Sequence, residues 1–229
     1  MNYFRHKKQL LVQKKLYNPL LISFVINIVA YNVSRLWTTS FHHTSLAVRF
    51  DSFIPVIPWT TVIYLGSYIF WIINYLIGAL QDDEDEAYSF LCADVLAKII
   101  CLIFFTVLPT TTLRPTITGA DIWSRLLRMV YRMDAADNLF PSIHCLTSQF
   151  SFIAVRKISS VPRWYKVFSM IAGGLICIST LTTKQHVVAD VFMGIALAEI
   201  SYGLVKVTGL SRFYNRVLNE NYEYERKLK

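Results

Sequence analysis

The sequence has 229 residues, of which 54% are hydrophobic and only 17% are charged, and its formal net charge is +8. This composition excludes a disordered chain, a fibrous repeat and most ordinary soluble globules, which need more polar surface. The hydrophobic residues also fall in blocks that approach or exceed the ~20 residues needed to cross a bilayer. The chain is therefore predicted to be a polytopic membrane protein.

Six hydrophobic blocks follow one another, and each predicts a helix because backbone inside a bilayer must satisfy its own hydrogen bonds. They cover residues 20–37, 54–80, 87–108, 141–155, 165–181 and 187–207. The blocks predict an all-α fold, a bundle of six transmembrane helices that forms a single domain over residues 1–229. The segments with candidate chemistry lie within residues 107–190, and basic tails occupy residues 1–18 and 208–229.

Basic residues crowd both ends of the chain and the short connection between the fourth and fifth blocks. They include Arg5, Lys7, Lys8, Lys14, Lys15, Arg156, Lys157, Arg163, Lys166, Arg212, Arg216, Arg226, Lys227 and Lys229. Such clusters beside membrane spans mark the cytoplasmic side and anionic lipid headgroups, so no nucleic-acid partner is expected. Both termini are therefore predicted to be cytoplasmic, which places residues 38–53, 109–140 and 182–186 on the extracytoplasmic side.

An amphipathic pattern with a helical period covers residues 120–133, inside the longest connection. Apolar side chains share one broad face, whereas Arg125, Arg128 and Arg132 share another. The pattern predicts an interfacial helix between the third and fourth spans. Its arginines either reach the phosphates of the bilayer surface, which is the commoner case, or belong to a lid that contacts an anionic headgroup.

Three short polar segments interrupt the hydrophobic sequence, all on the predicted extracytoplasmic side. They are Leu113-Arg114-Pro115, Pro141-Ser142-Ile143-His144 and residues 179–190. Pro141 suits the first position of a helix, and a helix N-terminus offers free N–H groups to an anion. Ser142 would add a hydroxyl group, and His144 would place an imidazole within reach of a bound phosphate.

The third segment supplies His186 and Asp190, whose spacing puts both on one face of a helix. A carboxylate bound to one ring nitrogen would fix the tautomer and make the other nitrogen a better nucleophile. Lys184 and Arg114 would add cations for phosphate oxygens. Each residue alone could be an ordinary interfacial contact, but together they indicate a phosphoryl-transfer site.

These segments resemble the signature of the type 2 phosphatidic acid phosphatase superfamily, whose motifs read KxxxxxxRP, PSGH and SRxxxxxHxxxD. The matching positions are Arg114, Pro115, Pro141, Ser142, His144, Ser179, His186 and Asp190. Three positions depart from the motifs: Val107 replaces the lysine, Ile143 the glycine and Thr180 the arginine. The TKQH sequence at residues 183–186 resembles a bacterial branch that is similar to inositol-phosphoryl and sphingolipid headgroup transferases.

The resemblance implies an integral enzyme of the bacterial plasma membrane whose active site faces the extracytoplasmic side. His186 would attack phosphorus to form a phosphohistidine, Asp190 would orient its ring, and His144 would serve as general acid and base. Arg114, Ser142, Lys184 and Ser179 would hold the phosphate oxygens. No cofactor or metal is expected. Phosphatidic acid, phosphatidylglycerol phosphate and polyprenyl pyrophosphate are candidate substrates.

The sequence is also compatible with three other functions. A phosphotransferase would move a phosphoryl-headgroup to an alcohol acceptor by the same chemistry. The missing motif cations are also compatible with a non-catalytic lipid-phosphate binder or transporter. Asp94 and Lys98, four residues apart inside the third block, would suit an ion-coupled carrier, although a buried structural pair is the commoner arrangement.

Overall fold

The computed structural model describes the backbone of residues 2–38 and 40–227 and the side chains of residues 16–36, 38 and 40–219. The α-helices are α1 (Asn2–Thr38), α2 (Thr61–Ala79), α3 (Glu84–Val107), α4 (Ile122–Met133), α5 (Ile143–Arg156), α6 (Arg163–Thr182), α7 (Val188–Thr208) and α8 (Leu210–Lys227). Two short 3-10 helices, η1 (Arg49–Phe53) and η2 (Pro58–Thr60), precede α2. The prediction of an all-α fold is confirmed.

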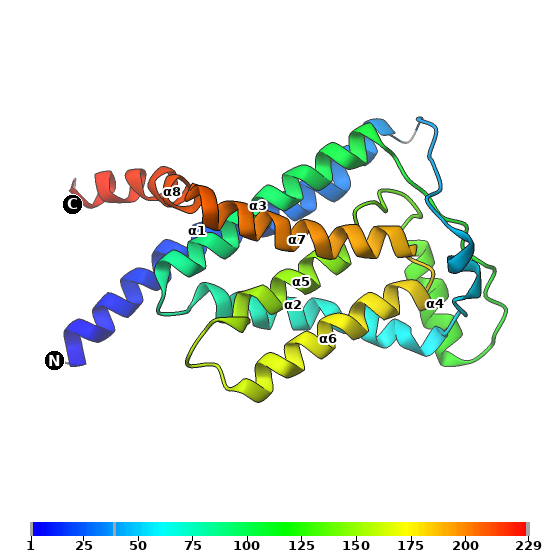
Figure 1. Ribbon diagram of the computed structural model, residues 1–229, viewed down its shortest axis with the longest axis horizontal. Helices are drawn as coiled ribbons and strands as arrows, with labels where there is room; N and C mark the ends of the chain where they lie inside the picture. Colours follow the sequence, from blue (N-terminus) through cyan, green and yellow to red (C-terminus); the bar gives the residue numbers. More distant parts are fainter. Residues whose placement is uncertain (1, 39, 228–229) are drawn as a thin grey trace.

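The structure is an elongated bundle, along which α1, α2, α3, α5, α6 and α7 run (Figure 1). Helix α1 begins, and α8 ends, at one end of the bundle, where the connection between α5 and α6 also lies. The opposite end carries α4, the two 3-10 helices and the connection between α6 and α7. Helix α5 packs against α2, α6 and α7 near the centre of the bundle.

Among the residues that the structure describes, five segments are long and apolar enough to cross a membrane, so the chain is an integral membrane protein. They are Leu16–Leu36, Pro58–Ala79, Glu84–Val107, Arg163–Thr182 and Val188–Thr208. The predicted count of six spans is not confirmed, because α5 has only 14 residues. Such a helix is about 21 Å long, whereas the hydrocarbon core of a bilayer is about 30 Å thick.

Local chemistry explains where the helices depart from the predicted blocks. Helix α2 begins at Thr61, seven residues after the predicted start at position 54. Pro55 and Pro58 delay it, because they lack the amide hydrogen that a helix interior needs. Helix α3 begins at Glu84 because the Asp83 side chain accepts a hydrogen bond from the backbone N–H of Glu86 at 3.0 Å.

Helix α8 was not predicted, because residues 208–229 read as a basic tail. It starts after Gly209, whose φ of 67° allows the chain to turn at the end of α7. Its Asn219 amide donates to the Tyr88 hydroxyl of α3 at 2.8 Å. Several basic side chains of the two tails lie outside the described residues: Arg5, Lys7, Lys8, Lys14, Lys15, Arg226, Lys227 and Lys229.

The helix predicted over residues 120–133 is α4. Its N-cap, Asp121, accepts hydrogen bonds from the backbone N–H groups of Trp123 and Ser124 at 3.0 Å and from the Ser124 hydroxyl at 2.6 Å. The side-chain and backbone hydrogen bonds from Ser124 lower the pKa of the Asp121 carboxyl. Leu127 and Val130 are buried on the inner face.

Candidate active site

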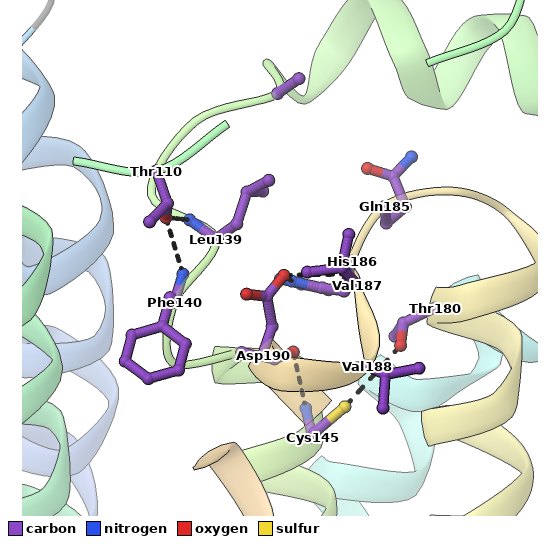
Figure 2. Close-up of polar contacts among 12 residues, drawn as sticks. Thr110, Leu139, Phe140, Cys145, Thr180, Gln185, His186, Val187, Val188 and Asp190 are labelled. Atoms are coloured by element: carbon purple, nitrogen blue, oxygen red, sulfur yellow. Dashed lines mark hydrogen bonds and ion pairs between the residues drawn. The ribbon is translucent and has the colours of Figure 1, made fainter. Parts of the chain in front are cut away.

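His186 and Asp190 lie where the connection between α6 and α7 enters α7. Nδ1 of His186 is 3.3 Å from Oδ2 of Asp190, and the same oxygen accepts a hydrogen bond from the backbone N–H of Val187 at 2.9 Å. Figure 2 shows this carboxylate beside His186 and Val187. Asp190 therefore caps the start of α7 and fixes the His186 ring, so that Nε2 is the nitrogen free to react.

Burial and charge act on His186 in opposite directions. The ring is only 8% exposed, and desolvation by itself would lower its pKa. The hydrogen bond and negative charge of Asp190 outweigh that effect, so the pKa of His186 lies above its ordinary value. The pair therefore favours a protonated ring in acidic solution.

His144 occupies the first turn of α5, where aromatic rings of α2 surround it. The Tyr64 ring stacks on the imidazole with a centroid distance of 4.3 Å and an interplanar angle of 19°. Trp71 and Tyr68 meet it edge to face at 5.1 and 6.0 Å. Nε2 of His144 is buried and has no hydrogen-bond partner among the described residues. The ring is thus held firmly and keeps one nitrogen available.

The starts of α5 and α7 meet closely, which brings the two histidines together. The backbone N–H of Ser142 donates to the carbonyl of Asp190 at 3.1 Å. At Gly194 a Cβ atom would lie only 2.6 Å from the Ser142 carbonyl oxygen, so this approach needs a residue without a side chain. The imidazole centroids of His144 and His186 are 6.1 Å apart.

A cavity of about 270 Å³ opens beside both imidazoles. Its walls come from α1, α2, the last residue of α4, the connection between α4 and α5, and the first turn of α5, together with Gln185 and His186. Nε2 of Gln185 is buried without a partner within the described part of the chain. The cavity therefore offers two imidazoles and an amide donor to one ligand, an arrangement that can bind and transfer a phosphoryl group.

The sequence matches the family model described as the PAP2 superfamily over residues 38–204. The chain belongs to the PAP2 superfamily. A search among curated proteins gave no match. Membership in the PAP2 superfamily supports phosphatase or phosphotransferase chemistry in general. The matched range includes all three motif segments.

Arg114, in the first PAP2 motif, lies next to the His186 connection. Its guanidinium donates to the side chain of Gln185 and to the backbone carbonyls of Asp134 and Ala135. It also lies 4.9 Å from the centroid of the Tyr131 ring. Nε of Arg114 is buried without a described partner. Arg114 is not among the residues that line the cavity, so it acts on the cavity mainly through Gln185.

Three other predicted phosphate contacts have different partners in the structure. Oγ of Ser142 accepts a hydrogen bond from the backbone N–H of Cys145 at 3.3 Å, as the N-cap of α5. The Ser179 hydroxyl donates to the carbonyl of Ile176 at 2.7 Å within α6. The Lys184 ammonium donates to the carbonyls of Asp51 and Ile54 at 2.9 and 2.6 Å. None of the three predicted residues lines the cavity.

The arginines of α4 also lie apart from the cavity lining. Arg125 donates to the carbonyl of Ala120, and Arg128 to those of Ile117 and Gly119, so both stabilise the entry to α4. Arg132 is exposed.

Of the three residues that depart from the PAP2 motifs, only Ile143 lines the cavity. Val107 is 77% exposed at the end of α3, so its side chain supplies nothing to the cavity. Thr180 is fully buried, where its hydroxyl donates to the carbonyl of Cys177 at 2.7 Å and lies 3.7 Å from Sγ of Cys145 (Figure 2). Ile143 is 8% exposed and lines the cavity beside His144. The cavity therefore has fewer cations than the motifs would supply.

Two residues at the site, Gln185 and Asp134, were not among the predicted site residues. Gln185 lies between two predicted site residues, Lys184 and His186. Its position inside the TKQH sequence was the one feature of the sequence that could have indicated a role at the site. Asp134 lines the cavity, and both of its carboxylate oxygens accept hydrogen bonds from tyrosines. Nothing in the spacing around Asp134 indicated this role, because its partners come from α1 and α2.

Proposed function

We propose that this PAP2 superfamily member is a phosphatase that cleaves a lipid phosphate through a phosphohistidine at the extracytoplasmic leaflet. The observation that carries the proposal is the pair of imidazoles, His144 and His186, whose centroids are 6.1 Å apart at one cavity. A tetrahedral phosphate between two such rings can meet a nucleophile on one side and a proton donor on the other.

The reaction has two steps. Nε2 of His186 attacks phosphorus while the bond from phosphorus to the lipid oxygen breaks, and His144 gives a proton to the departing alkoxide. A water molecule then attacks phosphorus, His144 takes its proton, and the bond from phosphorus to His186 breaks to release inorganic phosphate. Asp190 orients His186 and balances the positive charge on its ring throughout.

A lipid substrate is supported by an apolar cleft of about 560 Å³, lined mainly by α1 and α2. This cleft and the histidine cavity share three lining residues, Asn27, Tyr68 and Trp71. Leu21, Phe24 and Ile72 are among its apolar walls. A hydrocarbon chain in the cleft would place its attached phosphate in the histidine cavity.

The extracytoplasmic location rests on charge distribution. The connection between α6 and α7, which carries His186, lies at the bundle end opposite the start of α1 (Figure 1). The connection between α5 and α6 lies at the other end and carries the basic residues Arg156, Lys157 and Arg163. Short basic connections favour the cytoplasmic side, which assigns the histidine end to the opposite leaflet.

Transfer to an alcohol acceptor is the second candidate, and one feature of the site favours it. Val107 and Thr180 replace motif cations, and the cavity is lined by the carboxylates of Asp134 and Asp137. Fewer cations weaken the hold on a phosphate monoester dianion more than the hold on a diester monoanion. The bacterial transferase branch that the TKQH sequence resembles fits this chemistry.

One assay separates these candidates. Purified protein is incubated with a lipid phosphate, or with a phospholipid, in the presence and absence of alcohol acceptors, and inorganic phosphate and new phosphodiesters are measured. The phosphatase releases phosphate without an acceptor, whereas the transferase forms a product only with one. Loss of the observed activity in His186→Ala would support catalysis by His186. If the native protein binds lipid but turns none over, it is instead a binder or transporter.

A further inference from the structure

Asp134, which follows the last residue of α4, joins three parts of the site. One carboxylate oxygen accepts a hydrogen bond from the Tyr31 hydroxyl of α1. The other accepts a hydrogen bond from the Tyr64 hydroxyl of α2 at 3.1 Å. Because both oxygens have tyrosine donors, the carboxylate is fixed in place although it lines the cavity.

Tyr64 connects this carboxylate to His144. Its side chain is almost fully buried, and its ring lies nearly parallel to the imidazole at a centroid distance of 4.3 Å. A stacked ring restrains the tilt and translation of its partner, and the hydrogen bond to Asp134 restrains the tyrosine in turn. Asp134 therefore holds the tyrosine ring that stacks on His144.

The backbone of Asp134 reaches the second histidine. Its carbonyl accepts a hydrogen bond from Arg114, whose guanidinium also donates to the side chain of Gln185, the residue before His186. Asp134 is thus connected to the surroundings of both imidazoles. Its side chain reaches His144 through Tyr64, and its backbone carbonyl reaches the residue before His186 through Arg114.

We propose that Asp134 is a positioning residue for the general acid and base His144 and acts on it through Tyr64. The inference rests on the proposed function, since it assigns a partner to a histidine already given a role there. A direct contact of Asp134 with the phosphate is disfavoured because two anions repel each other. Burial and the nearby His186 disfavour the imidazolium that forms when His144 accepts a proton from water, and the negative charge of Asp134 opposes both effects.

Two substrates distinguish this role from a purely structural one. A lipid phosphate has an alkoxide leaving group that needs a proton, whereas p-nitrophenyl phosphate releases a phenolate that does not. With the aryl substrate, only the second step needs His144. A defect confined to His144 therefore leaves the first burst of p-nitrophenol intact and slows the steady state that follows it.

The test compares Asp134→Asn and Tyr64→Phe with the native protein by rapid mixing. In both variants we expect a burst with its rate constant unchanged within a factor of about 3, and a steady-state rate lower by ~10–100-fold. Turnover of a lipid phosphate should fall by a similar factor. Tyr64→Phe keeps the stacked ring and removes only the hydroxyl. It therefore tests the same link even if Asp134→Asn fails to fold.

Asp121→Asn is the matched control, because it makes the same chemical change at the exposed N-cap of α4, where asparagine also caps well. It should leave burst and steady state unchanged. Equal slowing of burst and steady state in Asp134→Asn, or no change in either, would overturn the role of Asp134. If the native protein forms no phosphohistidine with either substrate, the proposed function fails instead.

Discussion

The imidazoles of His144 and His186, which are 42 positions apart in the sequence, lie with their ring centroids 6.1 Å apart. One ring comes from the first turn of α5 and the other from the connection that enters α7. The hydrogen bond from the backbone N–H of Ser142 to the carbonyl of Asp190 ties these two helix starts together. The catalytic proposal depends on this relationship.

Replacement of Asp190 by asparagine should change the pH dependence of turnover. His186 attacks only as a neutral ring, and Asp190 raises its pKa, so protonation of His186 limits activity on the acidic side. Asp190→Asn removes the charge, lowers the pKa of His186 and moves the acidic limb of the profile to lower pH. The maximal rate should also fall, on the order of 10²-fold, because the ring is less well oriented.

The matched control for this change is Asp121→Asn, whose carboxylate lies outside the cavity lining. Its pH profile should coincide with that of the native protein. An acidic limb that stays in place, or that moves to higher pH, in Asp190→Asn would show that Asp190 does not raise the pKa of His186.

The close approach of α5 and α7 predicts opposite effects for two glycines of α7. A Cβ atom at Gly194 would lie 2.6 Å from the Ser142 carbonyl oxygen, whereas one at Gly203 would have nothing within 4 Å. Gly194→Ala should therefore displace the two histidines and lower turnover on the order of 10²-fold. Gly203→Ala should keep its activity and gain up to about 1 kcal/mol of helix stability. Equal activity in the two variants would contradict the proposed packing constraint.

The cleft between α1 and α2 predicts a dependence on the length of the lipid chain. Ile72 lines the cleft, whereas Ile69, in the same helix and similarly exposed, does not. Ile72→Trp should raise KM for a long-chain lipid phosphate and leave a short-chain analogue unaffected, because the indole fills space that a chain would occupy. Ile69→Trp should change neither. An equal KM for the long-chain substrate in both variants would place the chain elsewhere.

The buried pair of Asp94 and Lys98 is expected to stabilise the fold. The Lys98 ammonium lies 2.7 Å from Oδ2 of Asp94 and donates to the carbonyl of Ser23 in α1 at 3.2 Å, while the Tyr75 hydroxyl donates to Oδ1 at 2.7 Å. Lys98→Met should lower the free energy of unfolding in detergent by about 3–5 kcal/mol, because it leaves Asp94 unpaired.

The double variant, Asp94→Asn with Lys98→Met, removes both charges and should recover much of that stability. Phosphatase activity measured below the unfolding temperature should persist in the double variant. If its stability were native but an ion-coupled transport activity were lost, the pair would serve a carrier instead.

The fold was largely predictable because long apolar blocks have few alternatives in a membrane. The starts of α3 and α7 fell within three residues of the prediction. The predicted count of six spans is not confirmed, because the helix formed by the fourth block has only 14 residues. Helix α8 was missed because its polar sequence has no apolar block, and its contact with Tyr88 comes from tertiary packing.

For the site, local spacing predicted the contact between His186 and Asp190, which lie one helical turn apart. Spacing could not predict the contacts of Lys184. Its φ is 55°, and its ammonium group donates to the carbonyls of Asp51 and Ile54, far away in the sequence. Spacing also could not find Asp134, because the Tyr31 and Tyr64 hydroxyls that hold it belong to distant helices. Contacts within one turn follow from sequence, whereas those between helices require the fold.

The most direct test of the proposed chemistry is to locate the phosphate on the protein during turnover. The enzyme is mixed with a phosphate-labelled lipid, quenched at alkaline pH within milliseconds, digested and analysed by mass spectrometry. We expect one phosphorylated histidine, His186, in the native protein and no label in His186→Ala. Label on another residue, or unchanged turnover in His186→Ala, would contradict the mechanism.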